Sequence, residues 1–203
     1  MRFELTESLW REGDAGPMLW SLRERGTLRK QRLFAVAWYR RWLTDNAPQD
    51  DVSEVIDFAE QDADGELGQS EQIFQRNYAD PAIVGAPGEW AVVAVPSATG
   101  IAIYFLLEGW HDRANRQRNA DLIWELFGNP FRPVTFDPAW RTTDVLLLAR
   151  GIYDDRAFSA MPVLADALQE AGCENDDILA HCREADQPHA RGCWVVDLIL
   201  GKE

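Results

Sequence analysis

Residues 28–42, LRKQRLFAVAWYRRW, carry the clearest helical pattern in the chain. Apolar side chains recur there at intervals of three to five residues, and basic residues fill most of the opposite face. A period near 3.6 places such an apolar set along one side of an α-helix. Thr44, Asp45, Asn46 and Pro48 end the pattern. The stretch therefore predicts an amphipathic helix that buries one face.

Similar periodicity, interrupted by Gly, Pro, Asn and Asp, continues on both sides of this helix. Further helices are predicted near residues 17–22, 52–59, 101–110, 120–127, 143–153, 157–171, 175–183 and 191–200. Within residues 80–100, Gly and Pro predict a loop up to residue 88. The short apolar run Trp90–Val95 fits either a strand or a buried helical turn, and the lack of a visible partner strand favours helix. We expect an all-α, multi-helix bundle-like fold. A proline-rich linker at 130–140 predicts two helical parts, 1–130 and 131–203, with one continuous domain as the alternative.

Composition narrows the class of protein. The 203 residues carry a formal net charge of −14, and acidic residues concentrate in 51–100 and 151–203. Such a surface repels phosphate backbones, so we expect no nucleic-acid partner. The sequence lacks an apolar run of bilayer length and a signal-peptide pattern, which predicts a cytoplasmic protein without a membrane segment. Three cysteines make a poor disulfide framework and favour a reducing compartment.

Several local motifs carry a family resemblance. They are FGNPFRP at 127–133, DPAW at 137–140, ARGIYDDRAF at 149–158, RGCWVVDL at 191–198 and LGK at 200–202. In these motifs the chain resembles a large paralogous family of uncharacterised bacterial proteins. Where that family has a cysteine cluster, this chain has Val36–Tyr39. The resemblance is most specific over 120–203 and implies no particular activity.

The C-terminal region gathers residues that could carry chemistry. Two series are spaced by four residues: Cys173, Asp177 and His181, and then His189, Cys193 and Asp197. Side chains four apart share one face of a helix. A short connection at 184–188 would fold 175–183 and 191–200 into a hairpin that brings His181 near Cys193.

Three interpretations compete for these residues. Small buried cysteines behave as apolar residues, and the chain has no close Cys-x2-Cys pair, so a core role for Cys173, Cys182 and Cys193 is favoured. The first alternative is a zinc site formed by His181, His189, Cys193 and Asp177, because imidazole, thiolate and carboxylate are zinc ligands. The second is a reactive Cys193 thiol at a helix start.

For function, the favoured expectation is an acidic interaction or ligand-binding module without catalytic activity and without a cofactor. Its partner would be a basic protein or a small molecule, because acidic charge and exposed aromatic side chains suit a basic partner. The alternatives are a zinc- or thiol-dependent protein centred on the C-terminal Cys/His cluster, and an immunity-type inhibitor of a basic toxin.

Overall fold

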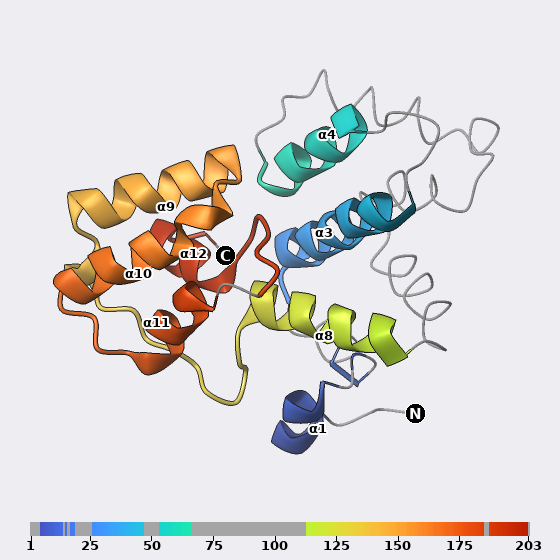
Figure 1. Ribbon diagram of the computed structural model, residues 1–203, viewed down its shortest axis with the longest axis horizontal. Coiled ribbons are helices and arrows are strands. Elements are labelled where there is room, and N and C mark those ends of the chain that lie inside the picture. The colour runs from blue at the N-terminus through green and yellow to red at the C-terminus, as the bar shows by residue number, and fades with distance from the viewer. Residues whose placement is uncertain are drawn as a thin grey trace. The chain divides into compact units, whose positions relative to one another are not determined.

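The computed structural model describes residues 5–13, 15, 17–18, 26–46, 53–65, 113–184 and 187–202, and all regular structure in them is helical (Figure 1). The α-helices are α1 (Glu7–Glu12), α3 (Leu28–Asn46), α4 (Ser53–Ala63), α8 (Arg113–Phe127), α9 (Thr143–Asp155), α10 (Met161–Glu170), α11 (Asp176–Arg183) and α12 (Trp194–Leu200). Two 3₁₀ helices, η2 (Pro138–Trp140) and η3 (Phe158–Ala160), precede α9 and α10. The all-α prediction is confirmed for this described part, which contains no strand.

Some predicted elements lie outside the described residues: most of the helix at 17–22, the ambiguous stretch 80–100, and the helix at 101–110. No helix within the described ranges is both long enough and apolar enough to cross a bilayer.

The chain divides into two compact units, Met1–Ala120 and Asp121–Glu203. The division falls inside α8, whereas the sequence predicted a boundary after residue 130. The proline-rich segment belongs to the second unit, where it forms a turn at 130–131, irregular chain and then η2.

In the first unit, the basic face of α3 pairs with the acidic helix α4. Arg29, Arg32 and Arg40 of α3 contact carboxylates of Asp64, Asp62 and Glu60 at 2.7, 3.1 and 3.0 Å. The carboxylates of Asp64 and Glu60 are almost completely buried. Buried charges require such partners, so charge pairing fixes the register of the two helices alongside apolar packing.

In the second unit, α9, α10, α11 and α12 enclose a hydrophobic core. Helix α10 lies against both α9 and α11, and α9 lies against α12. The core includes Val145, Ala149, Ile152, Met161, Leu164, Leu168, Ile178, Val195, Val196 and Ile199. Cys173, Cys182 and Cys193 belong to the same core, and all three thiols are free.

Polar residues set the helix boundaries in this unit. The Thr142 hydroxyl accepts the Val145 N–H at 3.4 Å, and the Asn175 amide oxygen accepts the Ile178 N–H at 3.1 Å. These caps satisfy backbone donors that the first turn leaves unpaired. The last helix begins at Trp194 and not at Arg191 as predicted, because Gly192 takes a left-handed φ of 93°. The predicted helix 157–171 is likewise divided into η3 and α10.

The C-terminal end of α12 accepts hydrogen bonds from Arg141, which lies directly after η2. The Arg141 guanidinium donates from Nε to the Ile199 carbonyl and from a terminal nitrogen to the Leu198 carbonyl, both at 2.9 Å. The last carbonyls of a helix lack intrahelical donors, so Arg141 satisfies two of them.

Candidate metal centre

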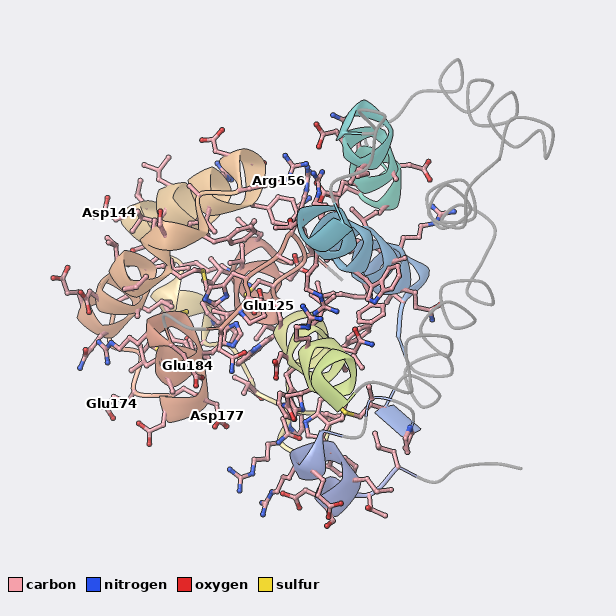
Figure 2. The ribbon with its side chains drawn as sticks, turned by 45° about the vertical axis from the view of Figure 1, so that its right-hand side comes forward. Glu125, Asp144, Arg156, Glu174, Asp177 and Glu184 are labelled. Carbon is pink, nitrogen blue, oxygen red and sulfur yellow. The ribbon has the colours of Figure 1, made fainter. Side chains whose placement is uncertain are left out.

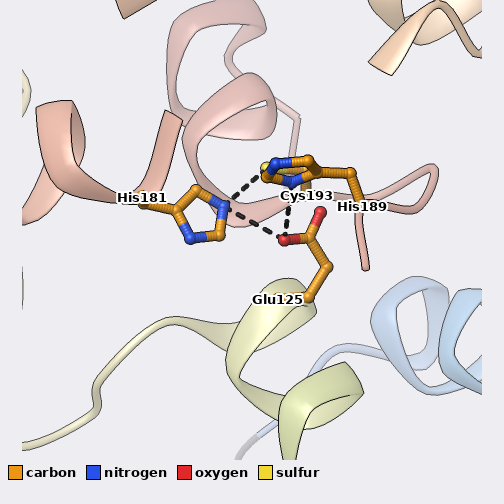
Figure 3. A group of neighbouring side chains, drawn as sticks. All are labelled: Glu125, His181, His189 and Cys193. Carbon is orange, nitrogen blue, oxygen red and sulfur yellow. Dashed lines mark hydrogen bonds and ion pairs between the residues drawn. The ribbon is translucent and has the colours of Figure 1, made fainter. Parts of the chain in front are cut away.

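Four side chains from three separate segments of the second unit converge on one point (Figure 3). They belong to Glu125, His181, His189 and Cys193. Each offers one ligand atom, and these four atoms all lie within 4.8 Å of one another. We call this group the Glu-His-His-Cys cluster.

Local structure places each of the four residues. Glu125 lies in the last turn of α8, which ends where Gly128 takes a φ of 61°. His181 lies in the last turn of α11, and Cys193 is the residue directly before α12. His189 comes from the connection between α11 and α12. The cluster therefore joins the end of α8, the end of α11 and the connection that leads from α11 to α12.

Gly128 allows α8 to approach α12 closely. A Cβ atom at this position would lie 3.1 Å from the indole of Trp194. The ring of Trp194 in turn lies 5.2 Å from the His181 ring, centroid to centroid. The position of Trp194 is thus linked both to the end of α8 and to one candidate ligand.

The Glu125 carboxylate is the hub of the cluster. It is completely buried. Its Oε2 lies 3.1 Å from His181 Nε2 and 3.1 Å from His189 Nδ1, while Oε1 accepts the Ala190 backbone N–H at 3.1 Å. His181 Nε2 also lies 3.2 Å from Cys193 Sγ. One imidazole nitrogen therefore faces both a carboxylate oxygen and the Cys193 thiol, which can itself donate or accept a hydrogen.

Neighbouring rings restrict both imidazoles. The His181 and His189 rings meet edge to face, with centroids 5.2 Å apart and planes at 82°. His189 stacks on Phe158 at 6.2 Å and 27°. Little of either imidazole reaches the surface, since the side chains of His181 and His189 are 13% and 8% exposed. Packing thus holds the two nitrogens towards Glu125 in a largely dry environment.

The pKa values of the carboxylate and the thiol in the cluster shift in opposite directions. Burial raises the pKa of Glu125, but hydrogen bonds and charge from His181 and His189 outweigh burial, so the pKa lies below its usual value. Burial and the Glu125 charge raise the pKa of Cys193 well above its ordinary value, although the backbone amides of Val196 and Val195 act in the opposite direction. Glu125 is therefore ionised at neutral pH, and Cys193 keeps its proton unless a cation replaces it.

The donor set fits a zinc ion. Bonds of about 2.0 Å to nitrogen and oxygen and about 2.3 Å to sulfur place tetrahedral ligand atoms about 3.3–3.6 Å apart. The three short separations of 3.1, 3.1 and 3.2 Å lie within a few tenths of an ångström of this range. The widest, at most 4.8 Å, must contract by about an ångström, which side-chain rotation can supply. The Ala190 N–H on Oε1 is the kind of supporting hydrogen bond that orients a ligating carboxylate.

The same geometry does not suit a Cys-His-carboxylate nucleophile. In such a triad the imidazole uses one nitrogen for the nucleophile and the other for the carboxylate. Here His181 Nε2 faces both Cys193 Sγ and Glu125 Oε2. Cys193 also has no exposed surface. A reactive thiol needs access and a lowered pKa, and Cys193 has neither.

Of the ligands proposed from sequence, His181, His189 and Cys193 come together, and Asp177 does not join them. Asp177 is exposed in the first turn of α11 (Figure 2), whereas His181 belongs to the last turn of that helix. The other candidates lie elsewhere in the unit. Cys173 and Cys182 are core residues, and Asp197 is buried inside α12.

Sequence reasoning missed Glu125. It lies 56 residues before His181, and no local spacing connects the two. The one available signal was its position within the apolar group Leu122, Ile123, Leu126 and Phe127, where a charged residue on a buried helix face requires a partner.

Comparisons with known proteins supply no further guide to this cluster, since no protein-family model, curated protein or solved structure matches the chain.

Proposed function

We propose that the second unit is a metal-binding module in which Glu125, His181, His189 and Cys193 hold one zinc ion. The observation that carries this proposal is the convergence of four ligand atoms within 4.8 Å in a buried position. Carboxylate, imidazole and thiolate together form a mixed hard and soft donor set, which suits a borderline cation such as Zn²⁺.

The role we propose for the ion is structural. Structural zinc sites use four protein ligands, whereas catalytic sites keep one position for water or substrate. The cluster offers four protein ligands, and two of them, Glu125 and Cys193, have no exposed surface. The ion would join the end of α8 to α11 and to the start of α12.

Iron is the competing metal. Two imidazoles and one carboxylate are the protein ligands of many non-haem Fe²⁺ sites, which keep open positions for other ligands. The Cys193 thiol next to His181 occupies one such position, which favours zinc. An interaction or ligand-binding role with a basic partner, and an inhibitor role, remain predictions from composition.

Metal analysis of the full chain, purified in reductant without added chelator, tests the proposal. We expect one equivalent of zinc per chain, and Co²⁺ substituted for it should show a thiolate-to-metal absorption band. Cys193→Ala should lose both signals. Cys182→Ala is the matched control, because Cys182 is equally buried but lies outside the cluster. Metal-free protein that takes up neither Zn²⁺ nor Co²⁺ would refute the proposal. One equivalent of iron in the purified protein would mean that the site binds iron and not zinc.

A further inference from the structure

The connection between α11 and α12 contacts the rest of the second unit at the cluster and at two aromatic rings, since His189 stacks on Phe158 and Arg191 lies over the ring of Tyr153. Residues 187–193 contain no helix. Within them, His189 Nδ1 contacts Glu125 Oε2, the Ala190 N–H binds Glu125 Oε1, and Cys193 Sγ lies beside His181. Two of these three contacts at the cluster end on a single carboxylate of α8.

The end of α8 depends on the same group. Leu122, Ile123 and Leu126 are buried, yet among the described residues the core formed around α9–α12 includes none of them. Glu125 contacts His181 of α11 and His189 of the connection, and Gly128 lies close to Trp194 of α12. Polar contacts at the cluster therefore join the last turn of α8 to the C-terminal helices.

These contacts also assemble a ligand set for one cation. His181 Nε2 lies 3.1 Å from Oε2 of Glu125 and 3.2 Å from Sγ of Cys193, so the three atoms already face one another. A metal ion would bind all four side chains of the cluster at once. An ion that binds the assembled cluster and not the separated segments favours the assembled state by mass action.

We propose that metal occupancy controls whether residues 187–193 dock against the last turn of α8. This inference rests on the proposed function and adds a regulatory role to the same site. With metal bound, the connection and residues 121–127 form one ordered element with α11 and α12. Without metal, the contacts of His189 and Ala190 with Glu125 open locally while the α9–α12 core, which includes Cys193, remains folded.

Hydrogen exchange on the full chain, with and without one equivalent of Zn²⁺, tests this proposal. Exchange reports local opening separately from global unfolding. We expect zinc to slow exchange at least about tenfold in residues 187–193 and 121–127, and the Ala190 amide should respond most strongly. Residues 161–168 of α10 are the internal control, and their exchange should stay within about twofold. Addition of a chelator should reverse the change.

Two variants provide matched controls. Glu125→Gln keeps the size of the side chain and an acceptor for the Ala190 N–H but removes the anionic ligand, so zinc should no longer slow exchange in residues 187–193. Asp177→Asn changes an exposed carboxylate of α11 outside the cluster and should respond as the unsubstituted chain does.

The outcomes separate the two proposals. Zinc uptake without any change in exchange at 187–193 would overturn the docking proposal and leave the metal site standing. Uptake accompanied by equal slowing in α10 would also overturn it, because the metal would then stabilise the whole unit. Failure to bind zinc at all would overturn the proposed function, and the docking proposal with it.

Discussion

The backbone N–H of Ala190 donates to Oε1 of Glu125 at 3.1 Å. This bond occupies one carboxylate oxygen and leaves Oε2 to face both imidazoles. A carboxylate held in this way coordinates a cation through one oxygen, which is compatible with a four-coordinate zinc ion. The bond also ties the residue after His189 to α8, so the backbone and a side chain of the connection are positioned together.

Loss of the Glu125 charge should weaken zinc binding strongly. Removal of a supporting group around a metal site lowers affinity about 10- to 100-fold, and Glu125→Gln removes a ligand, so we expect a loss of at least about 100-fold. Competition with a chelator of known affinity measures the change. Glu184→Gln, at an exposed position just after α11, is the control and should bind zinc as the parent chain does. Equal affinities for both variants would remove Glu125 from the ligand set.

Zinc affinity should fall as the pH is lowered. Binding requires a thiolate at Cys193, so one proton is released per ion, and affinity should drop by about tenfold per pH unit near neutrality. Zinc competition titrations between pH 5 and 8 measure this slope. A flat profile would contradict binding through Cys193.

The buried Cys182 thiol should make the protein less stable in alkali. Burial and the Glu125 charge raise the pKa of Cys182 from about 9 to about 12. Between these two values the unfolded chain releases a proton that the folded chain keeps, so stability falls as pH rises, by up to about 1.4 kcal/mol per pH unit. Urea unfolding in reductant at pH 8 and pH 10.5 tests this expectation. Cys182→Ala removes the titrating group and should show a shallower pH dependence than the parent chain, and identical slopes would count against it.

The close approach of Gly128 to Trp194 should make Gly128 harder to replace than other left-handed glycines. Gly128→Ala adds a Cβ 3.1 Å from the indole and places alanine at a φ of 61°, so we expect a loss of about 2–3 kcal/mol. Gly172→Ala also has a positive φ, of 88°, but no atom lies within 4 Å of its Cβ, so about 1 kcal/mol is expected. The difference between the two free energies of unfolding isolates the Trp194 contact. Equal losses would mean that the indole moves aside without cost.

The cap of α11 should matter for the metal site as well as for stability. Asn175→Ala removes the acceptor of the Ile178 N–H and should lower the free energy of unfolding by about 1 kcal/mol. Because His181 lies on the same eight-residue helix, zinc affinity should fall in the same variant. Thermal unfolding and a zinc titration measure the two effects. Asn175→Asp retains a capping oxygen and should restore both.

Helix starts could be predicted from sequence where a capping residue sets them. Thr142 and Asn175 are capping residues, and the helices after them begin at Thr143 and Asp176. The prediction failed at Arg191, because a left-handed glycine at 192 postpones the helix to Trp194. Glycine adopts either sign of φ at little cost, so its residue type alone does not reveal which one the folded chain selects.

The candidate site was only partly accessible from sequence. His181, His189 and Cys193 lie within thirteen residues, and a hairpin interpretation places them together. The spacing of four residues from His181 also favours Asp177, but in the fold the Asp177 side chain is exposed and lies outside the cluster. Glu125 joins through tertiary packing of α8, which no pattern of spacing records. Local periodicity identifies the face of a helix, and only the fold identifies what that face meets.

The bonds from Arg141 to the carbonyls of Leu198 and Ile199 have a mechanical consequence. They connect the chain just before α9 to the end of α12, so the residues between them form a loop closed by two parallel hydrogen bonds. A force that pulls residues 141 and 202 apart loads these bonds together with the packing of α12. In a single-molecule pulling experiment along this direction, Arg141→Lys should lower the rupture force, because a lysine ammonium lacks the planar fork that engages both carbonyls.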